Sequence, residues 1–121
     1  MKMKQADIIK AYNAAEGIAE TAKLNDMELW RIYRLRKALL PHIEFGQERD
    51  TAIRQKYTPY ADEKGMISGE TYKAFLAEMN ALGELEVDVE AERFPLRVAE
   101  GMTIAQMEAL DPFVEFTEPA E

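Results

Sequence analysis

The sequence predicts a single α+β domain that is mainly helical. Apolar residues recur every three or four positions through most of residues 1–83, which is the period of helices buried on one side. After Gly83 the period changes to two, as in a half-buried strand. With 121 residues, 47% of them apolar and 31% charged, the chain has the length and composition of one globular domain. We expect a helical hairpin at 1–57, a loop and third helix at 58–83, a small β/α element at 84–117 and a frayed tail at 118–121.

Two helices are predicted within the first 57 residues. The first, at about 5–22, carries a narrow apolar stripe of Ile8, Tyr12, Ala15, Ala19 and Ala22. The second, at about 26–57, has a suitable N-cap in Asn25 or Asp26 and ends before Pro59. Pro41 lies inside its apolar pattern, which resumes beyond the proline. We therefore expect a kink at Pro41 and not an end.

The long helix is apolar on two sides. One side carries the stripe Ile32, Leu35, Leu39 and Ile43, to which Ile53 and Tyr57 return. Leu29, Trp30, Tyr33 and Leu40 form a second apolar surface across the helix. This second surface either packs in the core or anchors another subunit, because buried Trp and Tyr dominate interface energetics. A chain of this length has little left to cover both sides, so we expect a protein partner, with a homo-oligomer as the favoured case.

The third helix should run over about 69–82, with Tyr72, Phe75, Leu76, Met79 and Leu82 on one stripe. Gly83 is well placed to end it in a left-handed turn. A strand at 84–90, an extended segment at 94–98 and a short helix from 103 to 110 should follow. Thr103 and Gln106 form a capping-box pattern for that helix. A last strand at 113–116 could pair with residues 84–90.

Charge is divided unevenly along the chain. Residues 1–57 carry 11 Lys/Arg and 8 Asp/Glu, whereas residues 58–121 carry 4 Lys/Arg and 15 Asp/Glu, so the two parts have net charges of +3 and −11. The acidic part is a poor neighbour for nucleic acid or an anionic membrane, and one half can attract the other within a copy or between copies. Glu84, Glu86, Asp88 and Glu90 should form an acidic face on one strand. A solvated face that discourages edge-to-edge pairing is favoured there over a cation site, because a straight row of carboxylates diverges.

The remaining side chains do not assemble a catalytic or metal motif. His42, the only histidine, follows Pro41 and is interpreted as a structural residue at a helix bend. Arg31, Arg34, Arg36 and Lys37 scatter around the helix circumference and form no single basic patch, so no direct nucleic-acid binding is expected. The chain has no Cys, and no apolar run reaches the roughly 20 residues of a membrane span. We expect a cytosolic protein that is not an enzyme and needs no cofactor or metal.

The order of these features resembles small, largely uncharacterised proteins of tailed bacteriophages and prophages. The similarity rests on Leu35–Pro41, Gln47–Arg49 and Tyr57 in the first half of the chain. It continues with Phe75–Leu82, the alternating Glu84–Val89 and the stretch Met107–Phe113. The resemblance covers most of the chain and implies a phage origin, hence a location in the cytoplasm of a bacterial host, with association with the virion left open. It transfers no functional residues.

We therefore expect a non-enzymatic phage or prophage protein that mediates protein–protein interaction, in virion assembly or as an accessory factor. The candidate interface is Leu29, Trp30, Tyr33 and Leu40. The alternative is an acidic inhibitor of a nucleic-acid-binding enzyme of the host or of a defence system. In that case the acidic face, Glu84, Glu86, Asp88 and Glu90, would occupy a basic groove as nucleic acid does.

Overall fold

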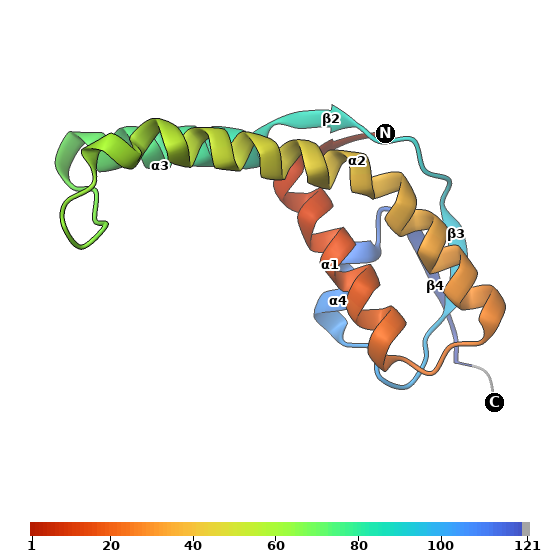
Figure 1. Ribbon diagram of the computed structural model, residues 1–121. Coiled ribbons are helices and arrows are strands. Elements are labelled where there is room, and N and C mark those ends of the chain that lie inside the picture. Colours follow the sequence, from red (N-terminus) through yellow and green to blue (C-terminus); the bar gives the residue numbers. More distant parts are fainter. Residues whose placement is uncertain (120–121) are drawn as a thin grey trace.

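The structure, a computed structural model that describes residues 1–119, is α+β and mainly helical, as predicted (Figure 1). Its elements in chain order are β1 (Lys2–Lys4), α1 (Gln5–Thr21), α2 (Asp26–Tyr57), the 3-10 helix η1 (Thr58–Tyr60), α3 (Gly69–Glu84), β2 (Glu86–Asp88), β3 (Phe94–Arg97), α4 (Ile104–Leu110) and β4 (Val114–Thr117). Of the predicted frayed tail, residues 118 and 119 lie outside any element, and residues 120–121 fall outside the described residues.

Helices α1 and α2 form the predicted antiparallel hairpin (Figure 1). Asn25 is the N-cap of α2: its side chain accepts a hydrogen bond from the backbone N–H of Glu28, and the Glu28 carboxylate accepts one from the N–H of Asn25. This capping box satisfies two donors that the first turn would otherwise leave without partners. The facing stripes are buried and make the core of the hairpin, with Ile8, Ala11, Ala15 and Ile18 on α1 and Ile32, Leu35 and Leu39 on α2.

Helix α2 continues through Pro41 and changes direction near its middle, as the predicted kink requires (Figure 1). Gln5 holds α1 to α2 just beyond the proline. Its side chain is 1% exposed, and its Nε2 donates a 2.7 Å hydrogen bond to the backbone carbonyl of His42. A Cβ at Gly46 would collide with this amide, so the glycine makes room for the contact.

Beyond this junction, the second half of α2 and helix α3 leave the rest of the molecule as an arm, which we define as residues 46–84 (Figure 1). Ile53 and Tyr57 of α2 are buried there, and the Tyr57 ring packs edge-on against Phe75 at 5.5 Å between centroids. None of the residues 69–84 of α3 is itself fully buried. The predicted end of α3 at Gly83 is wrong: the helix continues to Glu84, and Gly83 packs against Ala6 in a helical conformation.

The strands pair differently from the prediction. Strand β1, which the sequence analysis missed, pairs antiparallel with β2, and β3 pairs parallel with β4. The last strand therefore does not pair with residues 84–90. The reason lies in packing, because Leu96, Phe113 and Val114 are all buried when β3 and β4 lie side by side against the helical hairpin.

The C-terminal element, residues 94–117, covers one side of the α1–α2 hairpin. Helix α4 begins with the predicted capping box of Thr103 and Gln106, and it lies against α1 beside Gly17, where an added Cβ would be 2.7 Å from the Gln106 amide. Leu110 is buried against the hairpin. The loop before α4 approaches the end of α1 so closely that Gly101, with a φ of +98°, leaves no room for a side chain beside the Thr21 carbonyl.

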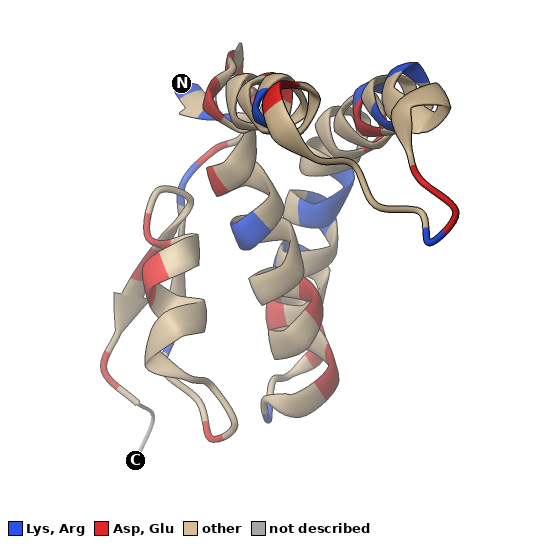
Figure 2. Cartoon of the chain, turned by 90° about the vertical axis from the view of Figure 1, so that its left-hand side faces the viewer, with Lys and Arg blue, Asp and Glu red and all other residues tan. Residues whose placement is uncertain are grey.

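The basic and acidic parts of the sequence form ion pairs with each other within one copy of the chain. Among the described residues, five of the eight ion pairs join residues 1–57 to the rest of the chain. The least exposed of them joins Arg97 to Glu28, the capping residue of α2, at 2.9 Å. In Figure 2, blue residues lie mostly on the helices and red residues occur along the whole chain. Attraction between the halves therefore helps to hold the C-terminal part against the hairpin.

Candidate protein-interaction surface

The second apolar surface of α2 faces away from the C-terminal element. Trp30 is 52% exposed and Tyr33 is 45% exposed, while Leu29 and Leu40 are half-buried. The Trp30 and Tyr33 rings are stacked with 5.5 Å between centroids, and the Lys37 ammonium lies 5.6 Å from the Tyr33 ring. The two aromatic rings stack on each other and are otherwise exposed to solvent. The interpretation of this surface as core packing is therefore wrong for these two residues.

This surface continues along α2 toward the arm. Tyr33, Leu40 and Gln47 are spaced by seven residues and so lie on one stripe of the helix. Gln47 lines a groove of about 820 Å³ between α1, α2 and α3. Gln47 therefore connects the stripe of Tyr33 and Leu40 to the margin of the groove.

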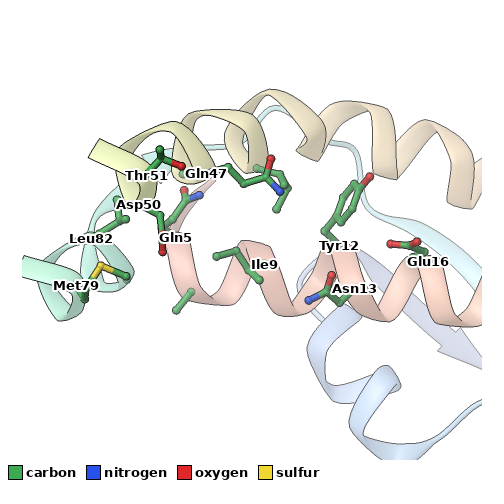
Figure 3. A pocket seen from close by; sticks show the side chains of 14 residues that line it. Gln5, Ile9, Tyr12, Asn13, Glu16, Gln47, Asp50, Thr51, Met79 and Leu82 are labelled. Atoms are coloured by element: carbon green, nitrogen blue, oxygen red, sulfur yellow. The ribbon is translucent and has the colours of Figure 1, made fainter. Parts of the chain in front are cut away.

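Figure 3 shows the groove with α2 above, α1 below and α3 at one end. Its floor is apolar and includes Ile9, Ile43, Met79 and Leu82. Asn13, Glu16, Asp50 and Thr51 supply polar groups at its margin. The Tyr12 ring also lines it, and the Arg36 guanidinium lies over that ring at 5.5 Å. Gln5 also lines the groove, and its buried Oε1 atom has no hydrogen-bond partner among the described residues.

The same side extends onto the arm. Tyr72, Leu76, Met79 and Gly83 recur at spacings of four, three and four, which places them on one stripe of α3. Met79 and Gly83 line the groove, and the stripe then leads outward to Leu76 and Tyr72, which are 39% and 45% exposed. We call the surface that comprises Trp30 and Tyr33, the groove, and Leu76 and Tyr72 the bare face. At its outer end Tyr72 also lines a hollow beside the loop of residues 61–67.

The predicted acidic face is not a row on one strand. Glu84 is the last residue of α3, only Glu86 and Asp88 belong to β2, and Glu90 follows the strand. These residues also have basic neighbours, because Lys4 lies opposite Glu86 and Lys2 opposite Asp88 in the β1–β2 ladder. The Glu84 carboxylate is 2.7 Å from the Lys4 ammonium and raises its pKa above the ordinary value.

The other candidates from the sequence do not converge. His42 is half-buried, and its backbone carbonyl, rather than its ring, makes the contact with Gln5. The four basic residues in the first half of α2 diverge, since Arg31 donates to the Pro95 carbonyl while Arg36 and Lys37 lie over different tyrosines. Over residues 1–119, no group of His, Asp or Glu side chains is arranged to bind a metal ion. None of the helices in this range has the length and apolar character needed to cross a bilayer.

Comparison of the chain with family models, curated proteins and solved structures gave no match. The function must therefore be inferred from the chemistry of the bare face itself. Sequence analysis identified the aromatic end of this face and the α3 stripe but missed the groove between them. The spacing of Tyr33, Leu40 and Gln47 is the signal that could have linked these parts, whereas nothing in the sequence marks Gln5 as a buried residue.

Proposed function

We propose that this protein acts by binding another protein through its bare face and not by catalysis. The observation that carries this proposal is the stacked, half-exposed pair of Trp30 and Tyr33 on a helix that the hairpin holds rigid. A Trp side chain has about 200 Å² of surface, so covering the exposed half of Trp30 would stabilise a complex by about 2.5 kcal/mol. Two adjacent, exposed aromatic rings are typical of an interface centre.

The biological setting follows from the resemblance to small phage and prophage proteins. We propose that the partner belongs to the phage or its host and that the protein serves as an assembly or accessory factor. The alternative of an acidic inhibitor has less support from the geometry, because the acidic residues are divided between two elements and partly paired with Lys2–Lys4.

A photo-crosslinking amino acid in place of Lys37, which is exposed beside the Tyr33 ring, introduced in infected or lysogenic cells, tests the proposal. The expected result is a covalent adduct with a specific protein, which is then purified and titrated against the wild-type chain. Trp30→Ala and Tyr33→Ala should each weaken its binding at least tenfold. The matched control is Ile104→Ala, since Ile104 is 72% exposed on α4, outside the bare face, and its loss should change nothing.

Equal affinity of the purified partner for the wild-type chain and Trp30→Ala would contradict the proposal. The same holds if Ile104→Ala weakens binding as much as Trp30→Ala does, since the contact would then not lie on the bare face. Circular dichroism of each variant shows whether the fold is retained, and both aromatic side chains are exposed enough for their removal to leave the core intact.

A further inference from the structure

We propose that the groove between α1, α2 and α3 binds a linear aliphatic polyamine in an extended form. The inference goes beyond the proposed function, because it concerns a small molecule and requires neither Trp30 nor Tyr33. The groove has a volume of about 820 Å³, which is within the usual range of small-molecule sites. Its two ends and its middle differ in chemistry, and each of them selects one part of the ligand.

A buried acceptor at one end of the groove lacks a donor. The Gln5 side chain is 1% exposed, and Figure 3 shows it extending from α1 toward α2 within the groove. Its Nε2 atom donates to the His42 carbonyl at 2.7 Å, which leaves Oε1 as the atom without a partner within residues 1–119. A buried carbonyl oxygen is costly to leave unpaired, so a ligand that brings an N–H to this end is favoured.

The lining of the groove carries negative charge only. Its charged residues are Glu16 and Asp50, and no Lys, Arg or His belongs to it. Arg54 contacts the Oδ1 atom of Asp50 at 2.6 Å, and the pair leaves the Oδ2 atom open. Glu16 forms no ion pair with any described residue, including Arg36, which lies over the neighbouring Tyr12 ring. The complementary ligand is therefore a cation.

The two carboxylates lie at opposite ends of the groove. Figure 3 shows Gln5 and Asp50 toward one end and Glu16 toward the other. The Ile9 side chain lies between them. On α1, Gln5 and Glu16 are eleven residues apart, which corresponds to about 16 Å along the helix axis. A compact cation cannot reach both ends, whereas an extended chain with a charge at each end can.

The middle of the groove selects the body of the ligand. Its floor is formed by apolar side chains, namely Ile9, Ile43, Met79 and Leu82. An inorganic cation would leave this floor against water. A linear polyamine carries ammonium groups like that of lysine, which are charged at neutral pH, at both ends of a methylene chain. One ammonium would donate to Gln5 and Asp50 and the other to Glu16, while the methylene groups would cover the floor.

Titration of the full chain with spermidine, followed by NMR of methyl groups and side-chain amides, tests the inference. The methyl signals of Ile9, Ile43 and Met79 and the side-chain amide signals of Gln5 should shift together and saturate with one dissociation constant. Magnesium chloride should leave these signals in place, because an ion attracted only by exposed carboxylates does not contact the floor. Hexylamine, which has one ammonium, should bind more weakly than spermidine.

Glu16→Gln and Asp50→Asn should each raise the dissociation constant of spermidine about threefold to fivefold, the loss typical of one partly exposed ion pair. The matched control is Glu63→Gln, which removes the same charge from an exposed residue in the loop of residues 61–67. It should bind spermidine like the wild type. Trp30→Ala should also bind spermidine unchanged, since Trp30 does not line the groove.

Equal losses of affinity in Glu16→Gln and Glu63→Gln would overturn the inference, because spermidine would then respond only to the net charge of the chain. The same conclusion follows if magnesium chloride shifts the groove signals as spermidine does. Hexylamine that binds as tightly as spermidine would show that only one end is used and would also overturn it. Circular dichroism shows that each variant is folded. None of these outcomes affects the proposed function, which is measured with the partner protein and Trp30→Ala.

Discussion

The Gln5 side chain lies against Gly46, where the arm begins. We therefore expect Gly46→Ala to change the free energy of unfolding in opposite directions in the wild-type chain and in a Gln5→Ala background. Gly46 lies inside α2, where alanine is normally favoured over glycine by about 1 kcal/mol. In the wild-type chain, however, the Cβ of Gly46→Ala would occupy the position of the Gln5 amide nitrogen. The hydrogen bond from Gln5 to the His42 carbonyl would break, and a side chain that is 1% exposed would lose the one polar partner it has within residues 1–119.

Leaving a buried amide unpaired costs about 2 to 3 kcal/mol. After the gain in helix propensity, Gly46→Ala should therefore destabilise the wild-type chain by about 1 to 2 kcal/mol. In a Gln5→Ala background the same substitution meets no amide and should stabilise by about 1 kcal/mol. The coupling between the two positions is then about 2 to 3 kcal/mol, well above the error of a double-mutant cycle.

Urea unfolding of the four proteins, followed by circular dichroism at 222 nm, measures all the terms of this cycle. If Gly46→Ala changes the free energy of unfolding in the same direction in both backgrounds, the proposed contact between the buried Gln5 amide and Gly46 is refuted. Stabilisation of the wild-type chain by Gly46→Ala would show that the glutamine moves aside without loss.

Two further substitutions test local features of the fold. Gly101→Ala should destabilise by about 3 kcal/mol in urea unfolding, because it combines a positive φ of +98° with a collision against the Thr21 carbonyl, whereas Gly65→Ala, at φ +77° in open space, should cost only about 1 kcal/mol. The Tyr57 hydroxyl and then the Lys56 ammonium hold the pKa of Glu78 below its ordinary 4.5. Ionised Glu78 therefore stabilises the arm above that pH, and the contribution is lost as the pH falls through the lower pKa of the folded state. Unfolding of wild type and Glu78→Gln between neutral and acidic pH should show a steeper loss of stability for the wild type, and equal slopes would refute the assignment.

The helices could be predicted from the sequence because their signals are local. The stripe of Ile32, Leu35 and Leu39 and the capping box of Thr103 and Gln106 depend on residues a few positions apart, and both are confirmed. Pro41 also bends α2 without ending it, since the helix gains enough from its buried side to tolerate one missing hydrogen bond.

The strand pairing could not be predicted, because strands of three or four residues contain too few hydrogen bonds to select a partner by themselves. Lys2–Lys4 pairs with residues more than 80 positions later, and its only apolar residue is Met3. Which strands meet is decided by the burial of Leu96, Phe113 and Val114 against the hairpin. The same limit applies to Trp30: periodicity shows that α2 has two apolar sides, but not which of them the rest of the chain covers.

The charges inside the molecule bear on how the bare face binds. Lys4 pairs with Glu84, Lys23 with Glu100 and Lys56 with Glu78, so part of the attraction between the basic and acidic parts of the chain is satisfied within one copy. The bare face presents exposed aromatic and aliphatic side chains instead. We therefore expect added sodium chloride to leave binding through the bare face intact, because salt screens exposed charges and does not weaken apolar contacts. A complex held by exposed charges would dissociate as ionic strength rises. Titration of the purified partner at low and high salt distinguishes the two, and dissociation at high salt would count against the proposed contact.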